Sequence, residues 1–248
     1  MNRPFAIYPD SFDGATLGHW RFGEGGGRLV AVVNAKTLTN HGTEAGQDGR
    51  RFVRADGDYM DAVYLGEPAR SQVTLECWVR DFKNDLGQHA QIAAYGLGAN
   101  DYLGILVGRN ADPLLSYITA AMIIGSVLVG YARWYYDAAV DALLASPKPW
   151  HVAAVLDATA SLKLFVNGTL RATDTTGIVA LPTGNCLLRL GRHITDWAGY
   201  DLSAVLDEIR VSTVARYTSD FTPVRYGEGR RAVVRGPGLD GLFAGVAA

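Results

Sequence analysis

The chain has 248 residues, of which 48% are aliphatic, aromatic or cysteine residues, so it can bury a hydrophobic core and is not intrinsically disordered. Its 29 glycines and its low share of charged residues, 19%, favour many turns and few exposed helices. The formal net charge of −2 supplies no basic field, so neither nucleic acid nor a membrane surface is an expected partner.

The first 11 residues are predicted to form an N-terminal arm. They contain Pro4 and Pro9, a single basic residue, Arg3, and no apolar run long enough for the core of a signal peptide. Export by a signal peptide is therefore not expected.

Residues 12–222 contain short strand-like runs separated by Gly, Asn, Asp and Pro, which is typical of an all-β domain. Alternation in the first strong run predicts one core face made of Val73, Leu75, Cys77 and Val79. Because Cys77 and Cys186 both lie in apolar runs, we interpret them as small buried side chains rather than a disulfide or a metal site.

Residues 113–149 are predicted to form an inserted hairpin and helix. The uncharged stretch 114–132 approaches the length of a membrane span, but Gly125-Ser126 between β-branched flanks favours a hairpin with a type II′ turn. Asp137 is the expected N-cap of a helix over 137–145, which Pro147 ends.

The apolar residues of this hairpin must either thicken the core or be covered by another chain. They are Ile118, Met122, Ile124, Leu128 and Tyr131.

Further strands are predicted at 150–156, 162–166, 187–190 and 205–211. Asn167-Gly168 follows the second of these and predicts a type I′ turn into a meander. After Pro223 the composition becomes rich in Gly, Ala and Arg. Residues 223–248 are therefore interpreted as an extended C-terminal tail, either frayed in solvent or docked on a partner.

Several motifs follow one another along residues 12–222. They are Gly18 to Gly27, Asn40 to Thr43, Val73 to Arg80, Trp150 to Asp157, Leu164 to Gly168, Leu188 to Gly191 and Val205 to Val211. This ordered set resembles laminin G-like domains of the concanavalin A-like lectin/glucanase superfamily. The resemblance implies a two-sheet antiparallel jelly-roll sandwich, with Trp78 and Trp150 near the core.

Enzymes of that superfamily that cleave β-glucans carry acidic residues alternating on one strand, so that two carboxylates flank the bond. Asp56, Asp58 and Asp61 approach this spacing, but Asp56-Gly57-Asp58 is predicted to be a turn. The arginine, glutamine-histidine and tyrosine motifs of the alginate-lyase branch are missing. A secreted glycoside hydrolase or polysaccharide lyase is kept as the alternative function.

The histidines are scattered without the spacing of zinc ligands and are expected on loops or strand surfaces; they are His19, His41, His89, His151 and His193. The resemblance implies one possible metal, a structural Ca²⁺ between the N-terminal glycine-rich loop and the last core strand, where Glu24 and Asp207 match. The acidic residue that many such domains carry after that loop is replaced by Val32-Val33-Asn34. The alternative is that Glu24 is exposed in a turn and that Asp207 accepts hydrogen bonds from backbone amides.

Sugar recognition needs an aromatic platform beside carboxylates or amides on a rim loop. Residues 192–201 have this composition and supply the candidate ligand-binding residues His193, Asp196, Trp197 and Tyr200. A competing group is Trp134-Tyr135-Tyr136 with Asn100-Asp101-Tyr102. Each of these aromatic rings suits packing against a neighbouring strand or subunit equally well.

The expected function is a non-catalytic structural or adhesive module, in the first place a bacteriophage virion protein that decorates the capsid or belongs to the tail. Laminin G-like domains act outside cells, yet neither a signal peptide nor a membrane anchor is recognised in this sequence. The expected partners are other virion proteins or a second copy of the chain, contacted through the inserted hairpin and the tail, and also glycans. The expected location is the virion or the extracellular space.

Overall fold

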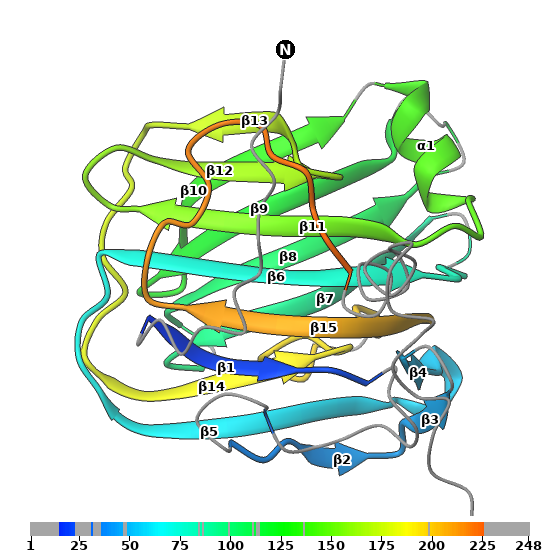
Figure 1. Cartoon of the computed structure of the whole chain (residues 1–248), viewed down its shortest axis with the longest axis horizontal. Helices are drawn as coiled ribbons and strands as arrows, with labels where there is room; N and C mark the ends of the chain where they lie inside the picture. Colours follow the sequence, from blue (N-terminus) through cyan, green and yellow to red (C-terminus); the bar gives the residue numbers. More distant parts are fainter. Residues whose placement is uncertain are drawn as a thin grey trace, which may run out of the picture.

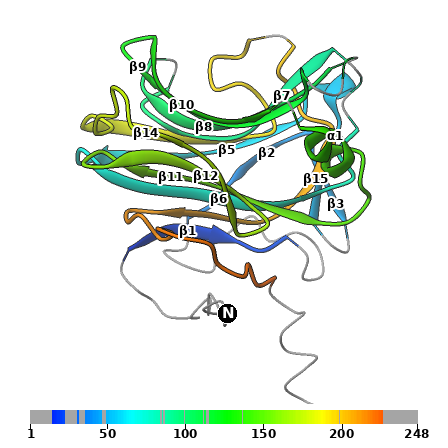
Figure 2. The same ribbon diagram turned by 90° about the horizontal axis from the view of Figure 1, so that it is seen from above.

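The computed structural model is a sandwich of two antiparallel β-sheets packed face to face (Figures 1 and 2). The predicted arm and the chain after residue 225 lie outside the described residues. The structure describes residues 15–22, 31, 36–46, 49–83, 85, 87–98, 100–110, 112, 115–135, 137–197 and 199–225.

The first sheet has eight strands in the order β13-β12-β11-β6-β15-β4-β3, and β1 pairs with β15 outside this path. Its strands are β1 (Thr16–Trp20), β3 (Glu44–Gly46), β4 (Gly49–Phe52), β6 (Gln72–Arg80), β11 (Trp150–Asp157), β12 (Ser161–Val166), β13 (Thr169–Asp174) and β15 (Ala204–Ser212).

The second sheet has seven strands in the order β10-β9-β8-β7-β14-β5-β2. Its strands are β2 (Thr39–His41), β5 (Tyr59–Glu67), β7 (Gln88–Gly96), β8 (Tyr102–Arg109), β9 (Tyr117–Ile124), β10 (Val127–Tyr135) and β14 (Gly184–Leu190). The described residues also form a 3₁₀ turn, η1 (Arg54–Asp56), and a helix, α1 (Ala138–Leu144). The predicted all-β sandwich is confirmed.

The core lies between the sheets and is built by alternation along each strand. Val73, Leu75, Cys77 and Val79 of β6 are at most 1% exposed, as predicted. Trp150 is fully buried in the core, but Trp78 is not in it. Trp78 lies half-buried on the opposite face of β6, 5.5 Å from the ring of His151. The period of two places Trp78 opposite its core-facing neighbours, so this prediction was wrong.

The inserted hairpin is present as β9 and β10, and it forms one edge of the seven-stranded sheet. Ile118 and Met122 are fully buried, so this half of the hairpin thickens the core. At its turn, Gly125 and Ser126 have φ of +57° and +67°. Two positive φ values belong to a type I′ turn and not to the predicted type II′ turn. The right-handed twist of the strands favours either form, and the sequence did not separate them.

The predicted helix is confirmed as α1. Asp137 caps it, because its carboxylate accepts a hydrogen bond of 2.8 Å from the backbone N–H of Ala139. The type I′ turn at Asn167-Gly168 is also confirmed, with φ of +50° and +72°. Within the described part of the chain, no helix is long and apolar enough to cross a membrane.

The outer face of the eight-stranded sheet carries a buried charged cluster, which residues 213–225 cover (Figure 2). The Glu76 carboxylate accepts from Arg210 Nε at 2.6 Å and from Tyr217 Oη at 2.8 Å, and it contacts His151 Nε2 at 3.0 Å. Burial by itself would raise the pKa of Glu76, but Arg210, His151 and Tyr217 hold it well below its usual range.

Two histidines contradict the expectation that histidines lie on loops or strand surfaces, because His19 and His151 are buried within β1 and β11, whereas His193 is buried but lies on a loop as expected. His151, His193 and His19 are 0%, 5% and 6% exposed. For His151 and His193, neighbouring polar groups offset the loss of contact with water. His151 contacts the carboxylate of Glu76, and His193 has partners at both ring nitrogens, described below.

We expect the charged cluster to make the fold sensitive to acid. Burial, followed by repulsion from Arg210 and Arg21, lowers the pKa of His19 from 6.5 to about 3. The unfolded chain therefore takes up a proton below pH 6.5 that the folded chain excludes. On account of His19 alone, the free energy of unfolding should fall by about 1.4 kcal/mol per pH unit below this point.

Denaturant unfolding at pH 7 and at steps down to pH 4 measures this slope. The variant His19→Gln should lose the His19 share of it, so its stability should fall less steeply with acidity. An equal slope in variant and wild type would contradict the prediction.

Candidate functional site

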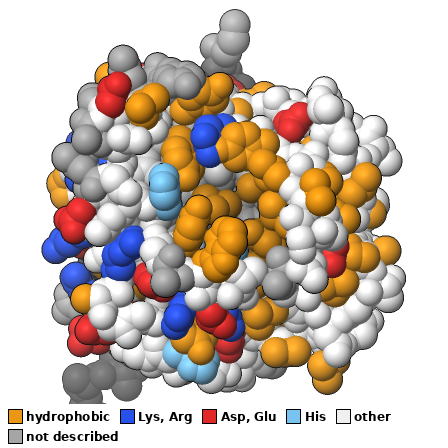
Figure 3. All heavy atoms as spheres, turned by 180° about the vertical axis from the view of Figure 1, so that it is seen from behind, with side chains coloured by type: hydrophobic (Ala, Val, Ile, Leu, Met, Phe, Trp, Pro, Cys, Tyr) orange, Lys and Arg blue, Asp and Glu red, His pale blue; other side chains and the backbone are white. Residues whose placement is uncertain are grey.

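The candidate site lies on the side of the seven-stranded sheet that faces away from the core, called the outer face below. The segment between β14 and β15, residues 191–197 and 199–203, runs back over this face and is called the crossing loop (Figure 2). Seen from this side, hydrophobic side chains gather around a hollow, with charged and histidine side chains beside it (Figure 3).

Two glycines of β8 leave room for side chains of the neighbouring strands. A Cβ atom at Gly108 would lie 2.3 Å from Cε1 of Tyr117, and one at Gly104 would lie 2.9 Å from Nε2 of Gln91. Neither glycine has a positive φ, so space rather than backbone conformation requires them. The side chains of the neighbouring strands β7 and β9 therefore lie directly against the backbone of β8.

Five rings form a continuous aromatic row across the outer face: Trp197, His193, Tyr200, His89 and Tyr117. Successive ring centroids are 5.3, 5.1, 5.8 and 5.7 Å apart in this order. Three of these rings come from the crossing loop, and one each comes from β7 and β9. The row thus joins the loop to the middle of the sheet.

The face continues with cationic and aromatic side chains at both ends of the row. Toward β10, the guanidinium of Arg133 lies 3.9 Å from the Tyr117 ring centroid. Toward β5, the guanidinium of Arg189 lies 4.8 Å from the ring of Tyr59, which stacks on His41 at 4.0 Å.

His193 is the buried member of the row, and hydrogen bonds fix its ring in place. Its Nε2 lies 3.2 Å from Tyr102 Oη and its Nδ1 lies 2.7 Å from Thr195 Oγ1, so both ring nitrogens are occupied. Burial, followed by the charge of Arg189, lowers the pKa of His193, which keeps the ring neutral at pH 7. Trp197 stacks on this ring and is 64% exposed, so most of its side chain is accessible to a ligand.

Asp196 fixes the loop and also offers an acceptor. Its Oδ1 accepts from Arg189 Nη1 at 2.7 Å and lies 3.4 Å from Arg192 Nε. Its φ of +59° belongs to the left-handed region, which Asp tolerates better than most residues. The side chain is 58% exposed, and Oδ2 has no hydrogen bond to any described residue.

Hydrogen bonds tie the crossing loop to β7 and to η1. The side-chain Oε1 of Gln91 accepts a hydrogen bond of 2.6 Å from the backbone N–H of Ile194. The backbone N–H of Gln91 donates to the carbonyl of Tyr200 at 2.9 Å. Arg54 donates to the carbonyls of Gly199, Asp201 and His89 at 2.8, 3.0 and 2.9 Å. This arginine therefore holds the end of the loop that carries Tyr200.

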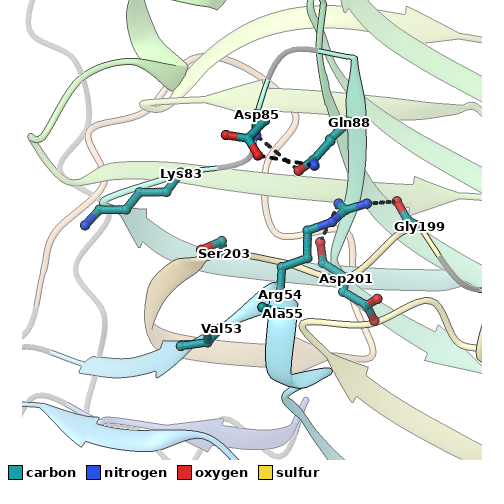
Figure 4. A pocket seen from close by; sticks show the side chains of 9 residues that line it. All are labelled: Val53, Arg54, Ala55, Lys83, Asp85, Gln88, Gly199, Asp201 and Ser203. Carbon is teal, nitrogen blue, oxygen red and sulfur yellow. Dashed lines mark hydrogen bonds between the residues drawn. The ribbon is translucent and has the colours of Figure 1, made fainter.

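A polar pocket of about 460 Å³ borders the same loop, on the side of η1 and the β6–β7 connection. Figure 4 shows Arg54 reaching toward Gly199 and Asp201 at its edge, and Asp85 and Gln88 turned toward each other. Its lining residues are Val53, Arg54, Ala55, Lys83, Asp85, Gln88, Gly199, Asp201 and Ser203.

The structure brings the four predicted ligand-binding residues together but disperses the competing group. Asn100 and Asp101 bond to the β9–β10 turn at Gly125-Ser126, whereas Trp134 lies near the other end of β10. Trp134 is 8% exposed and packs against the core, so it offers no platform. Tyr102 belongs to the first group, through His193.

The acidic residues considered above as a catalytic pair for glycan hydrolysis do not form such a pair in the structure. The turn at Asp56-Gly57-Asp58 is confirmed, since Gly57 has a φ of +66° directly after η1. The Asp58 carboxylate is 4% exposed and accepts from the N–H of Val53 at 2.9 Å. Asp61 lies on β5 and contacts Arg189 at 3.5 Å and His41 at 3.4 Å.

Asp207 does not suit a calcium ion in its described surroundings. Its Oδ1 accepts from the N–H groups of Phe22 and Glu208, and its Oδ2 accepts from Arg225 at 3.1 Å. Backbone amides and a guanidinium stabilise the carboxylate where a cation would have to bind. Glu24 lies outside the described residues, so the calcium pair stays a prediction. Over the described ranges, no three His, Cys, Asp or Glu side chains are grouped as metal ligands.

Sequence reasoning missed His89, Tyr117 and Arg133. Alternation contained a signal for the last of these, because Tyr131, Arg133 and Tyr135 occupy every second position of β10 and so share one face. Nothing in the sequence indicated that this face would continue the row that begins at Trp197.

Comparison with known proteins identifies one family. A laminin G family model described as the concanavalin A-like lectin/glucanases superfamily matches residues 54–220. No curated protein matched the chain.

Several solved structures share the fold. The receptor binding domain of botulinum neurotoxin D is 11% identical with a TM-score of 0.62, and the match covers 84% of this chain and 51% of that one. The binding domain of botulinum neurotoxin serotype D/C is 9% identical with a TM-score of 0.62, covering 84% and 50%. The chain thus spans about half the length of these toxin domains, and such low identities show the fold alone. A heptameric SAP-like pentraxin from Limulus polyphemus is 14% identical with a TM-score of 0.49, covering 73% and 77%.

We expect Arg54→Met to loosen the crossing loop. The substitution removes three hydrogen bonds from a charged donor to backbone carbonyls, at a cost of about 2 kcal/mol. Hydrogen exchange at the amides of residues 199–202 should become faster. Arg51→Met is the matched control, because Arg51 is an exposed arginine on the neighbouring strand β4. Equal exchange rates in the two variants would show that Arg54 does not hold the loop.

Proposed function

Because the chain belongs to the concanavalin A-like lectin/glucanases superfamily, we propose that it is a non-catalytic module that binds glycans on the outer face of its seven-stranded sheet. The observation that carries this proposal is the aromatic row from Trp197 to Tyr117. A row of several rings at steps of 5 to 6 Å suits an extended saccharide better than a single small molecule.

The chemistry of the row matches that of a sugar. Aromatic faces pack on the apolar C–H faces of pyranose rings, and polar groups beside them bind the hydroxyls. Trp197 is 64% exposed and is the leading platform. Oδ2 of Asp196 and the hydroxyl of Tyr200, which has no hydrogen bond to any described residue, are the polar groups beside it.

Two observations favour binding over cleavage. The Asp58 and Asp61 carboxylates are held by a backbone amide and by Arg189 with His41, which does not suit a paired acid and nucleophile. The toxin domains that share the fold are described as receptor-binding or binding domains. The superfamily also includes glucanases, so turnover has to be measured directly.

The more specific assignment, to a bacteriophage capsid-decorating or tail protein that contacts other virion proteins or its own copies, stays a prediction. A glycan-binding module suits a particle that attaches to a cell surface. Detection of the chain in purified particles is the observation that would support it.

We expect Trp197→Ala and Tyr200→Ala each to weaken glycan binding by about fivefold or more, because truncating a central aromatic contact commonly costs about 1 kcal/mol or more. Glycan-array screening followed by calorimetry with the strongest ligand measures the effect. Val179→Ala is the control, since it truncates a side chain that is 43% exposed and lies outside the outer face.

Mass spectrometry of the glycan after incubation tests the non-catalytic assignment. Unchanged chain lengths are the expected result. Shortened or unsaturated products would replace the proposal by the enzyme alternative, and full affinity in both aromatic variants would remove the row as the binding surface.

A further inference from the structure

We propose that the glycan is acidic and that Arg133 binds its carboxylate or sulfate group. This inference rests on the proposed glycan-binding function and names the chemical class of the ligand. Its basis is a single arginine at one end of the aromatic row.

Tyrosine rings frame Arg133 on the outer face. Its guanidinium carbon lies 3.9 Å from the ring centroid of Tyr117, 4.1 Å from that of Tyr131 and 5.9 Å from that of Tyr135. The guanidinium thus lies over tyrosine rings, and an arginine carries its N–H donors in one fixed plane. These in-plane donors match the two oxygens of a carboxylate or sulfate group.

Arg133 has no carboxylate partner among the described residues, and its buried Nε has no hydrogen bond. Two other arginines of this sheet are ion-paired. Arg189 contacts Asp61 and Asp196 at 3.5 and 2.7 Å, and Arg109 contacts Asp141 at 3.2 Å. A half-buried cation without a counter-charge favours an anion from outside.

The position of Arg133 lets one extended ligand reach both it and Trp197. The Tyr117 ring contacts Arg133 and also stacks on the ring of His89 at a centroid distance of 5.7 Å. Its Oη lies 2.9 Å from Nδ1 of His89, within hydrogen-bond distance. The row then continues through Tyr200 to Trp197. After burial, the charge of Arg133 is the next cause that lowers the pKa of His89, which is consistent with a positive local field.

The test compares acidic saccharides with matched neutral ones. The probes are oligosaccharides of alginate, polygalacturonate, hyaluronan and heparan sulfate, each beside its carboxyl-reduced or desulfated counterpart, together with neutral β-glucan and mannan oligosaccharides. Calorimetry is done on the full chain at pH 7 and at two salt concentrations. Loss of binding on carboxyl reduction would identify a carboxylate as the bound group, and loss of binding on desulfation would identify a sulfate.

The variants are Arg133→Met, which keeps an unbranched apolar stem, and Arg133→Lys, which keeps the charge without the planar fork. Arg171→Met is the matched control, because Arg171 also stacks on an aromatic ring, 4.3 Å from Trp134, but belongs to β13 of the other sheet. Thermal unfolding verifies that each variant is folded.

The expected result is that wild type prefers an acidic member over its neutral counterpart by about tenfold. Arg133→Met should abolish this preference while retaining the weaker neutral binding, Arg133→Lys should be intermediate, and Arg171→Met should equal wild type. Equal binding of the acidic and neutral members, or a preference that survives Arg133→Met, would overturn the inference and leave the proposed function standing. Absence of binding to every probe would overturn both.

Discussion

Alternation along β8, β9 and β10 is the constraint on which the rest of the site depends. Because successive side chains of a strand point to opposite faces, the residues that bury the core also determine which residues face outward. Ile118 and Met122 of β9 are fully buried between the sheets, and this register leaves Tyr117 on the outer face. Across the hairpin, Ala132 opposes Ala120 in the core, while Arg133 faces outward beside Tyr117. A shift of one residue would exchange the two faces and would remove the site together with the core.

The crossing loop is the second requirement, because it carries three of the five rings of the aromatic row. A loop over an open sheet face has little core of its own, so polar contacts must position it. Gln91 and Arg54 bond to its backbone, and Asp196 pairs with Arg189 on β14. The side chain proposed to offer an acceptor to the ligand is thus also one that fastens the loop. Binding and loop position are coupled through Asp196, and a ligand that contacts it would also stabilise the loop.

The two sheets use their outer faces differently. On the eight-stranded sheet, residues 213–225 cover the face, and Glu76 is buried there in contact with His151 and Arg210 (Figure 2). This arrangement satisfies charged groups that have lost contact with water. On the seven-stranded sheet, the crossing loop covers only part of the face, where Trp197 is exposed and Tyr200, Tyr117 and Arg133 are half-buried.

The sequence by itself determined the local features of this protein. Alternation predicted the core face around Cys77, and the Asn167-Gly168 pair predicted the type I′ turn. The composition of residues 192–201 indicated the four candidate ligand-binding residues. Each of these signals lies within a few neighbouring residues of the chain. Only the tertiary structure decided that His89 and Tyr117 continue the row from the loop, that Trp78 lies outside the core, and that Asp207 is held by amide groups and Arg225. The physical reason is that strand order and register bring together residues far apart in the chain, and no local pattern encodes which strands become neighbours.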